Sequence, residues 1–180
     1  MRSGLVRLKH VFSAYDWQAW MYHGRMTWLQ LMWFMLMLGI LAWLDGSAHF
    51  VWLVPPFAAT LTILLLLPRS PIAQPIAVVF GSTLGASVGT AVSLLVHGPF
   101  YAVLVAGLMV FWLPRLRIYH PPGVALSMYP LLLHTGIGFP LVVVLPFTLV
   151  SVATCSLLSR VSMDWPEYPM PLRRSSPEEG

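Results

Sequence analysis

The scarcity of charge along the chain is the feature that most limits what it can fold into. From residue 26 to residue 159 the formal charges are Asp45, Arg69, Arg115 and Arg117. Charged residues make up 9% of the 180 residues, compared with about 25% in an ordinary soluble domain. These charges are too few to cover the surface of a soluble globule. The composition therefore predicts a membrane protein and excludes a soluble enzyme, a nucleic-acid binder and a disordered chain.

Six apolar segments divide this part of the chain: 27–44, 50–67, 76–96, 99–113, 121–133 and 137–158. A helix rises about 1.5 Å per residue, so about 20 residues cross the roughly 30 Å of hydrocarbon in a bilayer. Two of the segments are interrupted or opened by proline pairs and leave about 13 residues of regular helix, because proline fits only the first turn. We therefore expect an all-α, polytopic transmembrane bundle in which two short helices begin at Pro-Pro.

The positions of the basic residues indicate the topology. If all six segments cross and the amino terminus is cytoplasmic, every lysine and arginine lies in the cytoplasm, as the positive-inside rule requires. Asp45, His97 and His134 then lie outside. If both short segments were re-entrant, Arg69, Arg115 and Arg117 would lie outside. Six crossings with both termini cytoplasmic are therefore favoured, in an integral membrane protein that we assign to a bacterial inner membrane.

The two ends of the chain differ from the apolar middle. Residues 1–26 are amphipathic and flanked by basic side chains, which predicts a helix lying in the membrane interface. Residues 27–160 form the expected transmembrane domain. Residues 161–180 contain Pro166, Pro169, Pro171 and Pro177 among mixed charges, and this composition predicts a disordered cytoplasmic tail.

Two stretches of the sequence resemble each other. Residues 55–67 (PPFAATLTILLLL) and 121–133 (PPGVALSMYPLLL) both start with Pro-Pro, continue with small residues and a hydroxyl, and end in leucines. The chain can therefore be divided into units 27–96 and 99–160 with three segments each. An odd number of crossings would invert the second unit, as in many secondary transporters. The alternatives are a chance resemblance between apolar sequences and plain proline kinks in packed helices.

The proline pairs predict a binding site. Helix starts leave N–H groups unpaired and carry a partial positive charge, so two of them converging from opposite faces would bind a small anion or polar solute. The candidate residues come from the two starts and from one amide nearby. They are Pro55, Pro56, Phe57, Ala58, Ala59, Gln74, His120, Pro121, Pro122, Gly123 and Ser127. The sequence has no histidine or carboxylate pair at helical ligand spacing, so we expect neither a metal nor a cofactor.

Three motifs carry a family resemblance. The triplet His120-Pro121-Pro122 resembles the signature of the HPP family of small integral membrane proteins. Residues 56–59 (PFAA) are similar to that family's PFGA-type stretch, and residues 71–75 (PIAQP) to its P-x-A-Q-P element. The resemblance extends over residues 50–160. It implies a membrane protein, usually described with four spans, for which transport is the suspected role and with which nitrite is associated in some members.

The chain also departs from the family pattern. Ala58 stands in the place of the glycine of PFGA, Ser82 in that of a histidine, and Ile76 in that of an arginine that many members have. The missing arginine removes an obvious partner for an anion, and this weakens the nitrite assignment in particular.

Several candidate residues allow a plainer interpretation. His120 and Gln74 could contact a solute, or they could cap the helices that follow them. Gly81, Gly85 and Gly89 recur every four residues and predict a face that another helix approaches closely. The partner could belong to the same chain or to a second copy.

Two functions remain open. The first is a small transporter or channel-like permease for a small anion or polar solute, with a homo-oligomer expected because the bundle is small. The second is a non-transporting assembly or lipid-interacting protein of the bilayer. An enzyme is not expected, since no nucleophile–base pair lies in the apolar segments.

Overall fold

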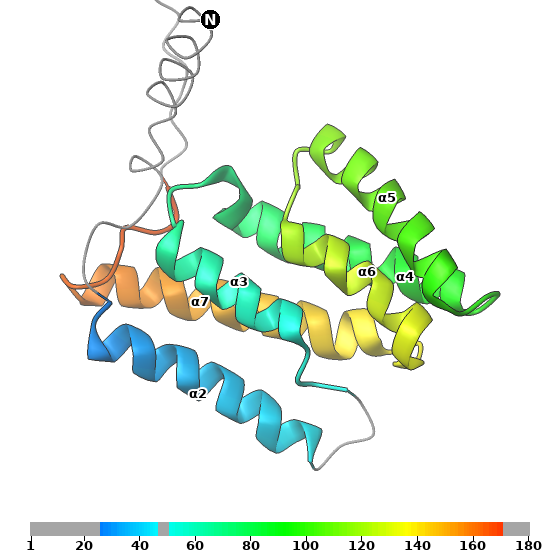
Figure 1. Ribbon diagram of the computed structural model, residues 1–180. Coiled ribbons are helices and arrows are strands. Elements are labelled where there is room, and N and C mark those ends of the chain that lie inside the picture. The colour runs from blue at the N-terminus through cyan, green and yellow to red at the C-terminus, as the bar shows by residue number, and fades with distance from the viewer. Residues whose placement is uncertain (1–25, 47–50, 171–180) are drawn as a thin grey trace, which may run out of the picture.

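The computed structural model describes residues 26–46 and 51–170, and in these residues it is all-helical, without strands. Six α-helices follow one another along the chain (Figure 1): α2 Trp28–Asp45, α3 Pro55–Leu66, α4 Ser82–Ser93, α5 Pro99–Arg115, α6 Pro121–Leu133 and α7 Leu145–Val161. A 3₁₀ turn, Pro71–Ala73, lies in the loop after α3. π-helical turns at Ala77–Gly81 and Phe139–Val144 lead into α4 and α7. The all-α prediction is confirmed.

The helix starts follow local chemistry. Thr27 and Gln30 form a reciprocal capping box at the start of α2, which satisfies two backbone donors. Prolines occupy the first turn of α3, α5 and α6, where their missing N–H costs nothing. The residue before each proline pair is extended: Val54 has φ −117° and His120 has φ −135°. This is the geometry that proline imposes on its predecessor.

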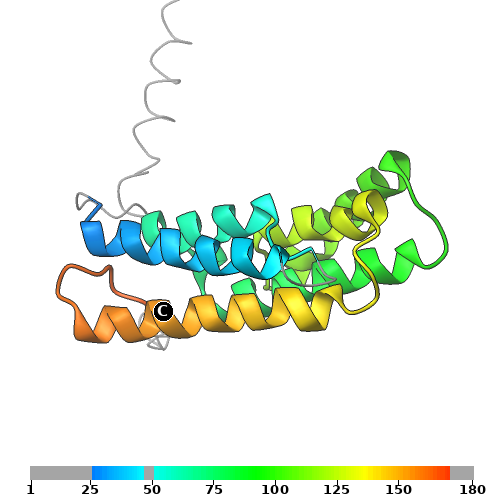
Figure 2. The ribbon, with the colours of Figure 1, turned by 90° about the horizontal axis from the view of Figure 1, so that it is seen from below.

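The helices lie side by side in an elongated bundle, and each runs opposite to the one before it (Figures 1 and 2). In Figure 1, α2, α3 and α7 lie on one side of the bundle and α4, α5 and α6 on the other. The two short helices α3 and α6 begin near the middle of the long dimension and run toward opposite ends. The proline pairs therefore bring both short helices to the centre of the molecule.

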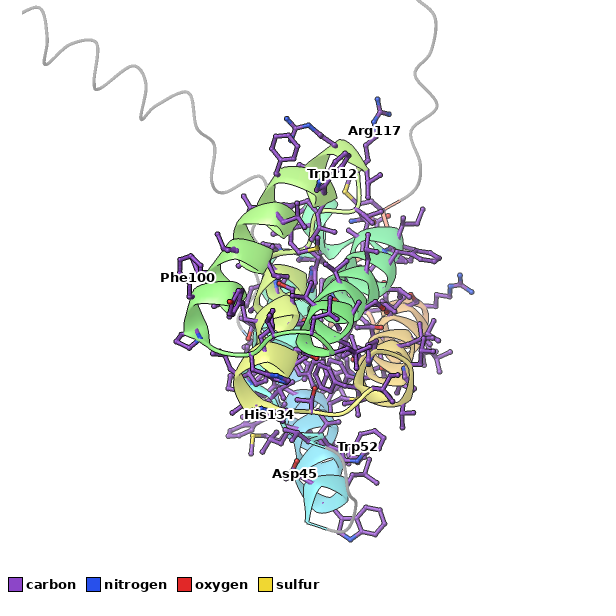
Figure 3. All side chains as sticks on the ribbon, turned by 90° about the vertical axis from the view of Figure 1, so that its right-hand side faces the viewer. Asp45, Trp52, Phe100, Trp112, Arg117 and His134 are labelled. Atoms are coloured by element: carbon purple, nitrogen blue, oxygen red, sulfur yellow. The ribbon has the colours of Figure 1, made fainter. Side chains whose placement is uncertain are left out.

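The core has two parts. The larger one joins α2, α3 and α7 to parts of α4 and α6, and it includes the stacked pair Phe57 and Phe147, whose ring centroids are 3.9 Å apart. The smaller part joins α5 to α6 around Val105, Leu113 and Leu131. Away from the core, large apolar side chains point outward, for example Phe100 and Trp112 on α5 (Figure 3). An outer surface of this kind suits lipid better than water.

Helices α4 and α6 touch through their backbones. A Cβ atom added at Gly81, Gly85 or Gly89 would overlap the carbonyl oxygen of Ile118, Gly123 or Ser127, respectively. A Cβ added at Gly123 would in turn lie 2.6 Å from the carbonyl oxygen of Gly81. The stripe of glycines, which begins in the π-helical turn and continues into α4, thus faces α6 and the residues just before it in the same chain. Small residues permit this arrangement between membrane helices.

The length of the helices leaves the number of crossings open. Among the described residues, Trp28–Asp45 and Phe139–Val161 are long and apolar enough to cross a membrane. The other four apolar helices are shorter, and the shortest has 12 residues. Six crossings and the 3+3 repeat therefore remain predictions, and the interfacial helix expected over residues 1–26 lies almost wholly outside the described residues.

The carboxyl-terminal part of the chain corrects one expectation. Helix α7 continues to Val161, and residues 162–170 then pack back onto the bundle instead of being disordered. Trp165 and Tyr168 are 5% and 3% exposed, and Trp165 meets Trp33 edge-on with ring centroids 5.4 Å apart. The prolines predicted disorder, but burial of the two aromatic rings removes a large apolar area from solvent and holds the segment on the bundle. Residues 171–180 lie outside the described part.

The close contact between α4 and α6 makes a testable prediction about stability. Gly85→Ala places a methyl group against the backbone of Gly123, so we expect the free energy of unfolding to fall by about 1–3 kcal/mol, the usual cost of overpacking. Thermal unfolding of the detergent-solubilised protein measures this. Gly107→Ala on α5 is the matched control, because an added Cβ there has nothing within 4 Å. Equal melting temperatures for the two variants would contradict the contact.

Candidate functional site

The two proline pairs meet at a shallow, largely open cavity of about 470 Å³. Its walls come from α3 and α6, and its lining residues are Pro55, Pro56, Ala59, Ile63, Pro121, Pro122, Ala125 and Tyr129. The volume lies in the range of small-molecule pockets. Because α3 and α6 run in opposite directions from this point, the cavity lies between two helix amino termini (Figure 1).

The lining residues occupy equivalent positions in the two similar stretches. Pro55 and Pro56 correspond to Pro121 and Pro122 as the first two letters of PPFAATLTI and PPGVALSMY. Ala59 corresponds to Ala125, and Ile63 to Tyr129, each four and eight residues after the first proline. Spacing of four keeps side chains on one helix face. Each short helix therefore presents the same face to the cavity.

The structure brings some predicted site residues to the cavity and leaves others away from it. Pro55, Pro56, Ala59, Pro121 and Pro122 line it. Ala58, Phe57, Gly123 and Ser127 do not. Phe57 is fully buried against Phe147, and Gly123 packs on Gly81. The hydroxyl of Ser127 donates to the carbonyl oxygen of Val124 at 2.7 Å.

Three lining residues were missed by the sequence reasoning: Ile63, Ala125 and Tyr129. The signal that could have found them is the four-residue spacing from each leading proline, since residues on that face follow the prolines along the helix. Tyr129 supplies the one hydroxyl among the lining side chains, all others being proline, alanine or isoleucine.

His120 lies buried between the two short helices and the loop before α4. Its side chain is 0% exposed. The Nδ1 atom lies 2.7 Å from the carbonyl oxygen of Ile72, which can only accept, so Nδ1 carries the hydrogen. The Nε2 atom lies 3.0 Å from the hydroxyl oxygen of Thr60, which is itself 3.1 Å from the carbonyl oxygen of Pro56. His120 thus ties the start of α6 to the start of α3.

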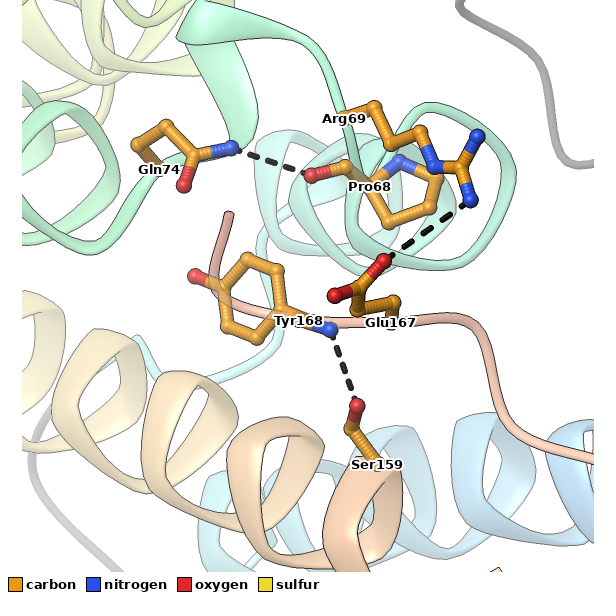
Figure 4. A network of polar contacts seen from close by, with 6 residues as sticks. All are labelled: Pro68, Arg69, Gln74, Ser159, Glu167 and Tyr168. Atoms are coloured by element: carbon orange, nitrogen blue, oxygen red, sulfur yellow. Dashed lines mark hydrogen bonds and ion pairs between the residues drawn. The ribbon is translucent and has the colours of Figure 1, made fainter. Parts of the chain in front are cut away.

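Gln74 is engaged elsewhere. Its side-chain nitrogen donates to the carbonyl oxygens of Pro68 and Ser70, both at 3.0 Å, and its side-chain oxygen accepts from the backbone N–H of Met170 at 3.1 Å. Figure 4 shows the side chain turned into the loop that follows α3. Its polar atoms therefore hold the loop and do not line the cavity.

The helix starts offer fewer donors than the sequence reasoning assumed. The first two residues of each short helix are prolines, which have no N–H. The third N–H is already paired, from Phe57 to the carbonyl oxygen of Val54 at 2.9 Å and from Gly123 to that of His120 at 2.8 Å. The helix dipole remains, but these first turns present no N–H donor to a ligand. The lining residues include no charged side chain either.

The fold and its outer surface define the class of the protein: an all-helical bundle, apolar on its exterior, with a cavity between two helix starts. The model of the family described as "HPP, transmembrane region" matches residues 20–169. The chain belongs to the HPP family and is an integral membrane protein. No curated protein and no solved structure gives a significant match.

The buried pair of Thr60 and His120 makes a second prediction. Thr60→Val keeps the shape of the side chain but leaves Nε2 of His120 buried without a partner, so we expect the free energy of unfolding to fall by about 1–3 kcal/mol. Thr62→Val is the matched control on the same helix, since that exposed hydroxyl bonds only the carbonyl oxygen of Ala58. Thermal unfolding in detergent compares them. A Thr60→Val protein as stable as Thr62→Val would show that this contact contributes nothing.

Proposed function

We propose that the protein is a small permease and that the cavity between α3 and α6 is its solute-binding site. The observation that carries the proposal is the meeting of two oppositely directed helix starts at one cavity of about 470 Å³. In membrane transporters, binding sites are built where broken or short helices end inside the bilayer. Irregular backbone at that depth is tolerated where it lines a cavity or is buried in protein.

The two-unit organisation supports this function. The lining residues fall at equivalent positions of the two stretches 55–67 and 121–133, which is what a 3+3 inverted repeat around a central site would give. The alternating direction of the six helices is compatible with six crossings, the shorter helices being flanked by extended chain such as residues 51–54. We propose six crossings with both termini in the cytoplasm.

The chemistry of the walls favours an uncharged solute over an anion. Proline, alanine and isoleucine surround the cavity, the proline pairs remove the N–H groups that would bind an anion, and Tyr129 adds one hydroxyl. Transferring an ion to such a site without partners costs several kcal/mol. We therefore propose a small uncharged polar solute, to which the hydroxyl of Tyr129 supplies a hydrogen bond. A nitrite-like anion is the competing substrate class.

The structure also supports a closed arrangement of the site. His120 and Thr60 are both 0% exposed and join the two helix starts beneath the prolines. A solute in the cavity would have to separate these starts to pass toward the end of the bundle that holds the loop 67–76. We propose that breaking the contact between Thr60 and His120 accompanies transport.

Filling the cavity tests the proposal. Ala59 is an exposed lining residue, so Ala59→Trp should be tolerated by the fold. The indole should fill the site and lower flux to that of empty vesicles. Ala153→Trp, at an exposed position on α7, is the matched control and should transport normally. Proteoliposome swelling with glycerol, urea and acetamide measures uncharged solutes, and a dye-based assay measures nitrite, formate and chloride.

The outcomes separate the substrate classes. Uptake of an uncharged solute that Ala59→Trp abolishes supports the proposal as stated. Uptake of anions alone, equally sensitive to Ala59→Trp, would keep the site but replace the solute class. No solute moving faster than in empty vesicles would overturn the permease function and leave a non-transporting membrane protein.

A further inference from the structure

The segment that follows α7 holds the loop on which His120 rests. This segment, residues 162–170, is called the strap below. It leaves the end of α7 and returns along the bundle to the loop that joins α3 to α4 (Figure 4). The strap does not touch the cavity, but hydrogen bonds and the backbone of the loop connect it to the starts of α3 and α6 beside the cavity.

The strap is anchored at its near end by α2 and α7. The side-chain nitrogen of Gln30 donates to the carbonyl oxygen of Asp164 at 3.1 Å, and Gln30 is itself 2% exposed. The indole N–H of Trp165 donates to the sulfur of Cys155 at 3.5 Å. The backbone N–H of Tyr168 donates to the hydroxyl oxygen of Ser159 at 2.8 Å. Buried polar contacts of this kind fix the path of a segment that has no helix or strand of its own.

The far end of the strap is hydrogen-bonded to the loop that joins α3 to α4. The N–H of Met170 donates to the side-chain oxygen of Gln74, whose nitrogen holds the carbonyl oxygens of Pro68 and Ser70. Arg69 and Glu167 form an ion pair at 3.8 Å, but both side chains are more than half exposed, so this pair contributes little. The amide of Gln74 is therefore the main polar link between strap and loop.

The loop in turn supports His120. The carbonyl oxygen of Ile72, two residues before Gln74, accepts from Nδ1 of His120, and Nε2 of the same ring meets Thr60 at the start of α3. The hydrogen bond of Met170 with Gln74 and that of Ile72 with His120 are thus joined by the backbone of residues 72–74, and the path continues from His120 to Thr60. Gly81 lies against this path, because a Cβ added there would come within 3.2 Å of Cβ of His120.

We propose that the strap is a latch that keeps the permease closed: bound to Gln74, it presses the loop 67–74 onto His120 and so keeps the starts of α3 and α6 together. Release of the strap frees the loop, removes the support of Ile72 from His120 and lets the two helix starts separate. The latch rests on the proposed function for its effect on flux, but its effect on the loop does not depend on transport.

The tyrosine of the strap is suited to this role. Burial raises the pKa of the Tyr168 phenol above its ordinary value. The ring is 3% exposed and stays neutral at physiological pH. The buried ring therefore anchors the strap by packing in the larger part of the core.

Removing the backbone N–H of Met170, which donates to Gln74, tests the latch. Met170→Pro removes the N–H that Gln74 accepts, while Met170→Ala retains it and is the matched control. We expect Met170→Pro to increase amide hydrogen exchange in residues 67–74 and solute flux by about two- to tenfold, the factor that one hydrogen bond is worth. A chain ending at Ser162 should show a larger increase in both. A chain ending at Met170 retains the strap and should behave as the full chain.

The readouts separate the latch from the permease. Faster exchange in the loop together with faster flux supports the latch. Unchanged exchange in a folded Met170→Pro protein overturns it, and so does faster exchange with unchanged flux of a transported solute. If the full chain transports nothing, faster exchange in Met170→Pro supports the hold of the strap on the loop and contradicts the permease alone. If the chain ending at Ser162 does not fold, the comparison of Met170→Pro with Met170→Ala tests the latch by itself.

Discussion

The position of two proline pairs is the constraint on which the rest of the site depends. Proline fixes its own φ, extends the residue before it and has no N–H, so Pro55-Pro56 and Pro121-Pro122 determine where α3 and α6 begin. Both helices are therefore short, and both start near the middle of the bundle. The same chemistry leaves the cavity between them without donors from the first turns. The proline pairs therefore determine both the position of the cavity and its preference for an uncharged solute.

A second contact keeps α6 in place. The glycine stripe of α4 lets the backbones of α4 and α6 touch, so α6 cannot slide or rotate without overlapping Gly81, Gly85 or Gly89. This contact positions His120 under the loop that the strap holds. The rigid pair of α4 and α6 and the start of α3 are joined by the bond between His120 and Thr60. Movement within the site is therefore expected at that bond and not between α4 and α6.

Local chemistry was predictable from the sequence, and long-range contacts were not. Proline acts on its neighbours, so both short helices and their first residues followed from the letters alone. Gln74 was expected beside the cavity, but its partners come from a loop and from Met170, far away in sequence. The strap was expected to be disordered because its prolines outweighed Trp165 and Tyr168, whose burial depends on α2 and α7. The N–H donors expected at the two helix starts are absent because the prolines that mark these starts have no N–H.

Cysteine accessibility is the measurement that tests most directly whether the paired helix starts line a solute path. Ala59→Cys, Ala125→Cys and, for comparison, the outward-facing Ala153→Cys are treated with a small thiol reagent in proteoliposomes; the native Cys155 is buried and little exposed to the reagent. If the helix starts line the path, modification at Ala59 or Ala125 stops flux and the transported solute slows both reactions. Modification at Ala153 then leaves flux unchanged. Full labelling at Ala59 and Ala125 with undiminished flux would contradict it.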